Sequence, residues 1–157
     1  MQQLSSQLGD GQLEVHLSPP ADPDVVERLQ ERFPRQWIDF HRLTDGVLFT
    51  WEPAGRPLDY KQIKIPALGA HGWVVGPRND ISYLRVDGDP RYVSSYYKLE
   101  LGGSPDAAVI VATVDGDFER SDLPICDTLD EYIELAIRYE LRTDWPDQYA
   151  MNRKHAP

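Results

Sequence analysis

The segment Phe33–Trp51, FPRQWIDFHRLTDGVLFTW, places a short aromatic helix, a helix stop and a strand in consecutive residues. Pro34 fixes φ in the helical region and suits the first turn of a helix, where its missing N–H is not needed. Asp45-Gly46 supplies a residue that can turn left-handed and end the helix. The sequence VLFTW that follows is rich in β-branched and aromatic residues, which favour strands. The segment therefore predicts a helix that leads directly into a strand.

The residues before this segment predict one strand and one further helix. Residues 12–17 alternate between polar and apolar side chains, as expected for a strand with one buried face. Asp22 can cap a helix whose first residue is Pro23, and residues 23–33 carry apolar side chains at helical spacing. Two short helices are therefore expected to meet at Pro34.

The residues after Trp51 predict a series of strands and a closing helix. Strand character occurs at 62–65, around 73–75, and at 81–86, 96–101 and 108–114, with turn sequences between several of these segments. Residues 108–114 are apolar on both faces, as expected for an interior strand. Thr128 and Glu131 form a capping box, and the apolar side chains that follow predict a helix to about Arg142.

These elements predict an α+β fold. We expect a twisted, mostly antiparallel sheet of about five or six strands, packed with two N-terminal helices and one C-terminal helix. A chain of 157 residues fits a single domain, with its core at about 12–142 and a tail at 143–157. No run of about 20 apolar residues or secretory signal is present, so a cytoplasmic location is expected. The single cysteine agrees with a reducing compartment.

The chain is acidic, with 26 Asp and Glu residues against 16 Lys and Arg residues and a formal net charge of −10. This balance argues against nucleic acid as a partner, because the phosphate backbone would be repelled. Residues 115–134 contain eight acidic residues and one basic residue, and so carry seven of the ten net negative charges. This segment is expected to be either a solvated loop and helix start, where acids suit the helix dipole, or a docking surface for a basic partner.

Motifs for catalysis and metal binding are weak in this chain. Asp115 to Glu119 resembles the start of a calcium loop, but an EF-hand needs Gly at its sixth position and Glu at its twelfth, where this chain has Arg120 and Cys126. The sequence lacks an HExxH motif, a P-loop, a GxSxG elbow and a GxGxxG fingerprint. Cys126 with His41 or His71 is a possible nucleophile pair, although a buried, inert thiol is favoured. We therefore predict no catalytic residue, no cofactor and no metal.

Three short motifs of this chain are Phe33-Pro34 followed by Trp37-Ile38-Asp39-Phe40, then Thr44-Asp45-Gly46, and TLDEYI at 128–133. Together they resemble the SUKH superfamily, which includes yeast cell-wall synthesis regulators of the Smi/Knr type and many bacterial proteins. The first is similar to the proline and aromatic helix of that family, the second lies where members often carry Asn-Gly, and the third is similar to the opening of the terminal helix. The resemblance covers most of residues 20–142, with a Pro-rich insertion before Gln62 as a departure.

The resemblance implies a non-enzymatic binding protein, in bacteria most often an immunity protein that neutralises a toxin by covering it. An acidic surface suits this role, because carboxylates can mimic phosphate and steer a basic toxin domain towards the surface. A regulatory or scaffold module that binds cellular proteins is one alternative, and a small metal-dependent hydrolase using Asp115 to Glu119 is another. The oligomeric state is open. The predicted partner-binding residues are acids and accessible tyrosines: Glu52, Asp87, Asp89, Tyr92, Tyr96, Asp115, Asp117 and Glu119.

Overall fold

The computed structural model describes residues 2–56, 61–70, 72–76, 78–87, 94–113, 123–139, 141, 149 and 152. Within these residues the elements are β1 (Gln2–Leu8), β2 (Gly11–Leu17), α1 (Pro23–Leu29), α2 (Arg35–Leu43), β3 (Val47–Pro53), β4 (Lys61–Ile65), β5 (Val74–Val75), β6 (Ile81–Arg85), β7 (Ser94–Glu100), β8 (Val109–Thr113), β9 (Leu123–Cys126) and α3 (Leu129–Arg138). Two 3-10 turns, η2 (Leu68–Ala70) and η3 (Pro105–Ala107), lie in the connections.

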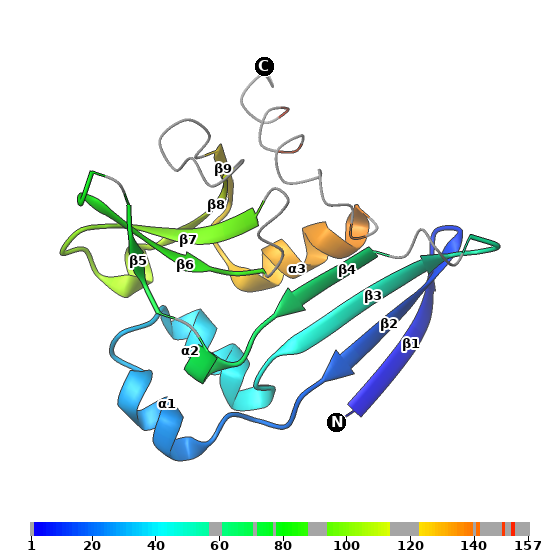
Figure 1. Ribbon diagram of the computed structural model, residues 1–157, viewed down its shortest axis with the longest axis horizontal. Helices are drawn as coiled ribbons and strands as arrows, with labels where there is room; N and C mark the ends of the chain where they lie inside the picture. The colour runs from blue at the N-terminus through cyan, green and yellow to red at the C-terminus, as the bar shows by residue number, and fades with distance from the viewer. Residues whose placement is uncertain are drawn as a thin grey trace.

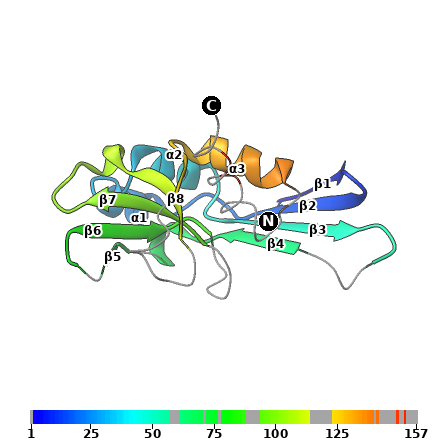
Figure 2. The same cartoon turned by 90° about the horizontal axis from the view of Figure 1, so that it is seen from above.

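The strands form two antiparallel sheets, which lie towards opposite sides of the molecule in Figure 1. Sheet A has the order β1-β2-β3-β4, and sheet B has the order β5-β6-β7-β8-β9. Sequence neighbours pair throughout, so each sheet is a meander. Figure 2 shows α2 and α3 along one side of the strands. The helices therefore cover one face and leave the outer face of sheet A to polar side chains.

The α+β class, the antiparallel pairing and the two early helices with a closing helix are confirmed. The predicted single sheet of five or six strands is instead two sheets of four and five strands. The added strands are β1 and β9, whose sequences QQLSSQL and LPIC carry few β-branched residues. Residues 109–113 form an interior strand as expected, because β8 pairs with β7 on one side and β9 on the other.

The buried hydrophobic residues form one cluster that includes side chains of both sheets and all three helices. Trp37 of α2 is fully buried in this cluster. Its indole meets the ring of Tyr97 on β7 edge to face at 5.8 Å, and the ring of His41 one turn along the helix at 4.8 Å. Helix α2 therefore packs its aromatic face directly against sheet B.

At the N-termini of both α2 and α3, a backbone N–H donates a hydrogen bond to a side chain far away in the sequence. The residue before α2 is Pro34, whose side chain cannot cap, and Asp106 of η3 accepts the Arg35 N–H at 2.8 Å instead. The amide of Gln36 accepts the N–H of Leu129, the first residue of α3, and donates to the Asp127 carbonyl at 3.0 Å. These bonds join α2 to the β7–β8 connection of sheet B and to the start of α3.

Replacing Gln36 with Ala should lower the free energy of unfolding by about 1–2 kcal/mol, because the substitution removes two hydrogen bonds at the junction of α2 and α3. The loss is measured by urea unfolding at equilibrium.

The matched control is Gln62→Ala on the outer face of sheet A, where Gln62 is exposed. This substitution should change the free energy of unfolding by less than about 0.5 kcal/mol. Equal effects of the two substitutions would show that the Gln36 bridge does not contribute.

Candidate functional site

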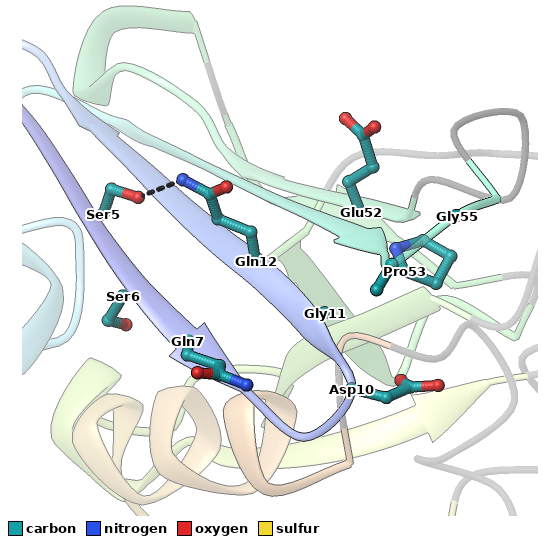
Figure 3. A pocket seen from close by; sticks show the side chains of 10 residues that line it. Ser5, Ser6, Gln7, Asp10, Gly11, Gln12, Glu52, Pro53 and Gly55 are labelled. Atoms are coloured by element: carbon teal, nitrogen blue, oxygen red, sulfur yellow. Dashed lines mark hydrogen bonds between the residues drawn. The ribbon is translucent and has the colours of Figure 1, made fainter.

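The candidate site is a shallow groove of about 420 Å³ at the end of sheet A where β1 turns into β2. Figure 3 shows the side chains that line it. Its lining comes from β1, the β1–β2 turn, the start of β2 and the end of β3: Ser5, Ser6, Gln7, Asp10, Gly11, Gln12, Glu52, Pro53, Ala54 and Gly55. Most of these side chains are small or carry amides, hydroxyls and carboxylates, so the groove is polar.

The groove depends on a tight turn that lies over a buried tryptophan. Gly9 has φ of 60°, the value that a two-residue turn requires when glycine occupies its first central position. Trp51 of β3 is buried beneath the turn and donates its indole N–H to the Leu8 carbonyl at 2.9 Å. A Cβ atom on Gly11 would lie only 2.5 Å from Trp51 Cε2, so glycine is required where the two strands cross this ring.

The charged groups of the groove are exposed and mostly acidic. Glu52 is exposed at the end of β3, and Asp10 is exposed in the turn. The guanidinium of Arg56 lies 3.8 Å from the Asp10 carboxylate, but both side chains are about two-thirds exposed, so water screens this pair. The Gln12 amide donates to the Ser5 hydroxyl at 2.6 Å across the β1–β2 pair (Figure 3). The groove thus offers carboxylates beside amide and hydroxyl groups.

The predicted partner-binding residues do not form one cluster within the described residues. Glu52 lines the groove on sheet A, whereas Tyr96 lies on β7 of sheet B and Asp87 follows β6. The remaining members lie outside the described residues: Asp89, Tyr92, Asp115, Asp117 and Glu119. The four described acids of residues 115–134 are all exposed: Asp127, Asp130, Glu131 and Glu134. Asp130 and Glu131 lie in the first turn of α3, where they suit the helix dipole.

Tyr96 is half-buried and takes part in contacts on its own sheet. Its ring meets that of Tyr83 edge to face at 6.1 Å, and the guanidinium of Arg85 lies 5.7 Å from the ring centroid. This arrangement leaves only part of the ring for a partner. The neighbouring Tyr97 is fully buried, as the alternation of β7 predicts, and burial raises the pKa of its hydroxyl.

Asp87 was predicted to be a partner-binding carboxylate on the surface, but the structure places it inside the protein. It is buried, and one carboxylate oxygen accepts the hydroxyl of Tyr132 while the other accepts the Ser95 N–H at 3.2 Å. Burial raises the pKa of Asp87 above its usual 3.8, and burial together with the nearby Asp87 raises the pKa of Tyr132 well above 10. Asp87 joins the end of β6 to β7 and α3, so its carboxylate is occupied within the fold.

The other candidates for chemistry occupy packed positions. His41 is buried between the rings of Trp37 and Phe40, with Nδ1 at 3.2 Å from the Asp45 carboxylate. Cys126 is buried, and its thiol lies 3.5 Å from the Thr128 carbonyl. Across the described part of the chain, Asp, Glu, His and Cys side chains form no group of three that could hold a metal ion. The predicted alternative metal site at residues 115–119 lies outside that part.

Sequence reasoning identified Glu52 but missed Asp10, Gln12 and Gly55 as members of the groove. The signal available for them was Gly9-Asp10, a dipeptide typical of a two-residue hairpin turn, which precedes an alternating strand. To place Asp10 and Glu52 in the same groove, the sequence would also have to indicate the register of β2 on β3, in which Gln12 lies opposite Glu52.

None of the helices in the described ranges combines the length and apolar character needed to cross a bilayer. The chain matches no protein-family model, and comparisons with curated proteins and with solved structures find no match. The resemblance to the SUKH superfamily therefore stays a prediction from short motifs.

Replacing Gly11 with Ala should lower the free energy of unfolding by about 1–3 kcal/mol, because the new methyl group overlaps the Trp51 ring and the Glu52 carbonyl. Urea unfolding measures the loss. The tryptophan fluorescence, to which Trp51 contributes as one of four Trp residues, should also change.

Gly72→Ala is the matched control for this substitution, because an added Cβ at Gly72 meets nothing within 4 Å. We expect it to leave the free energy of unfolding within about 0.5 kcal/mol of the original chain. A Gly11→Ala variant as stable as this control would contradict the close contact of the turn with Trp51.

The raised pKa of Asp87 predicts a specific dependence of stability on pH. Between 3.8 and the raised folded pKa, the folded chain holds the Asp87 proton more tightly than the unfolded chain. The contribution of Asp87 to stability is therefore complete below 3.8 and is lost as the pH rises through the folded pKa. Asp87→Asn, which is neutral at every pH, should remove this decline from unfolding curves measured between about pH 4 and pH 8.

Asp130→Asn serves as the control, since Asp130 is exposed in the first turn of α3. Its pH profile should keep the decline seen in the original chain. If the Asp87→Asn profile also keeps that decline, the burial of the Asp87 carboxylate does not govern the pH dependence.

Proposed function

We propose that this chain is a protein-binding domain of the SUKH kind that acts in the cytosol as an immunity protein. In this role it neutralises a toxin by direct binding and catalyses no reaction itself. The observation that carries the proposal is the groove at the tip of sheet A, which presents the exposed carboxylates of Glu52 and Asp10 beside amide and hydroxyl groups.

A basic toxin domain suits such a surface for two physical reasons. The net charge of −10 attracts a positively charged partner over distances of about a Debye length and raises the association rate. Lys and Arg side chains of the partner can then pair with the carboxylates while their remaining donors reach the hydroxyl and amide groups nearby. The groove supplies both kinds of acceptor on elements held by strand pairing.

The rigidity of the groove also supports a binding role. The β1–β2 turn is fixed by the Trp51 indole, and the Ala54 N–H donates to the Asp10 carbonyl at 2.9 Å. A preorganised surface loses little conformational entropy when a partner docks. The buried acid Asp87, in contrast, joins strands to α3, so its carboxylate is not available to a partner.

The experiment measures binding between the purified chain and the product of the neighbouring gene, together with protection of cells that express that product. The double substitution Asp10→Lys and Glu52→Lys should weaken binding at low salt by about 10-fold or more, mainly through a slower association rate. Added salt should weaken the binding of the original chain, because it screens the exposed charges.

The matched control places the same charge change on Asp24 and Glu27, which are exposed on α1. In Figure 1 this helix lies at the opposite end of sheet A from the β1–β2 turn. This control should bind more tightly than the groove variant. Absence of both binding and protection would reject the immunity role. Binding that both variants weaken equally would place the docking surface elsewhere.

A further inference from the structure

The outer edge of sheet A is formed by β1, and in the part of the chain that the structure describes no strand pairs with its free side (Figure 1). Residues Gln2 to Gln7 are all exposed, and Leu4 keeps half of its surface in contact with solvent. The strand pairs with β2 through seven consecutive residues without a bulge. It is therefore a long, regular edge strand.

Among the described residues, this edge lacks the features by which proteins usually prevent edge strands from pairing. Such protection comes from charged side chains, proline, bulges or a covering element. The sequence of β1 is QQLSSQL, which has no charge and no proline in a chain that is 27% charged. The edge formed by β1 is therefore uncharged, although the groove at the end of the same strand is acidic.

The register of the hairpin fixes which backbone groups point outward. The two-residue turn makes Leu8 and Gly11 a hydrogen-bonded pair, and such pairs alternate along an antiparallel ladder. The Ala54 N–H donates to the Asp10 carbonyl. The backbone N–H and C=O groups of even-numbered residues in β2 therefore point towards β3, and those of odd-numbered residues point towards β1. The N–H and C=O groups of Gln3, Ser5 and Gln7 therefore point to the free edge.

These three residues are complementary to a second copy of themselves. When two β1 strands run antiparallel with Ser5 opposite Ser5, Gln3 of each copy lies opposite Gln7 of the other. All outward N–H and C=O groups then find partners, and the facing amide side chains can hydrogen-bond to each other. The same arrangement brings Leu4 of each copy opposite Ser6, which covers part of its exposed surface.

We propose that two copies of this chain associate through β1, paired antiparallel about Ser5, to form a continuous eight-stranded sheet from two copies of sheet A. The charge pattern favours a second copy as the occupant, because a strand with no charge can approach an identical strand without direct repulsion. A single strand pair buries less area than the roughly 1,200 Å² at the lower limit of stable interfaces. The dimer is accordingly weak, with a Kd of about 10 µM to 1 mM.

The first test measures the mass of the full chain by light scattering over a range of concentrations. The mass should rise from 17.9 kDa towards twice that value, and added salt should promote the rise because it screens the repulsion between two copies of net charge −10. Ser5→Pro should abolish the rise, since the Ser5 N–H points to the free edge and its loss spares the pairing with β2. Circular dichroism checks that the variant is folded.

The second test determines the register with a thiol cross-linker shorter than about 10 Å. Ser5→Cys places two thiols on directly opposed residues whose Cα atoms are about 5.5 Å apart, so it should cross-link. Two Gln3→Cys chains place their thiols four residues apart along the strand, about 14 Å, and should not cross-link. A mixture of Gln3→Cys and Gln7→Cys chains should cross-link.

Two results would overturn the proposal. One is a mass that stays at 17.9 kDa at the highest concentration, or that rises equally in the Ser5→Pro variant. The other is cross-linking of Gln3→Cys alone at the rate of Ser5→Cys, which would reject pairing about Ser5. The native thiol does not compete in these experiments, because Cys126 is buried.

Discussion

The contact of helix α2 with sheet B is the interaction on which the arrangement of the two sheets depends. Trp37 is fully buried and meets Tyr97 of β7 edge to face, while the chain leaves the C-terminal end of α2 through Gly46 directly into β3 of sheet A. Gly46 has φ of 110°, and a Cβ there would lie 3.0 Å from the Ile65 carbonyl, so this junction needs glycine. The helix is thereby packed on one sheet and covalently joined to the other.

Local patterns were sufficient for the elements whose signals lie within a few residues. The Thr128 hydroxyl accepts the Glu131 N–H at 3.3 Å, as expected from a capping box. Asp22 caps α1 in a similar way, because its carboxylate accepts the N–H of Asp24, two residues further along the chain. The division into two sheets could not be predicted in this way. It depends on contacts such as Asp106 with the start of α2, 71 residues away, and Gln36 with the start of α3, 93 residues away. The local sequence around a polar residue does not indicate a hydrogen-bond partner so far away in the chain.

The sequence predicts a residue of the candidate site only where the local context indicates that its side chain is exposed. Glu52 follows the last aromatic residue of a strand and is exposed as expected. Asp87 is also acidic and lies in a sequence typical of a turn, yet it is buried. The Tyr132 hydroxyl and the Ser95 N–H replace the hydrogen bonds that it would make with water. Sequence spacing cannot distinguish these two cases, since one partner of Asp87 is 45 residues away.

Trp51 links the acidic groove to the neutral edge, because its ring lies beneath Gly11 while its indole N–H holds the Leu8 carbonyl at the end of β1. The two surfaces therefore share one support but differ in charge. The proposed association through the groove uses exposed carboxylates and should weaken as salt is added, whereas the proposed association through β1 uses backbone groups between like-charged chains and should strengthen. Opposite responses to ionic strength would allow one small sheet to carry two adjoining binding surfaces for different partners.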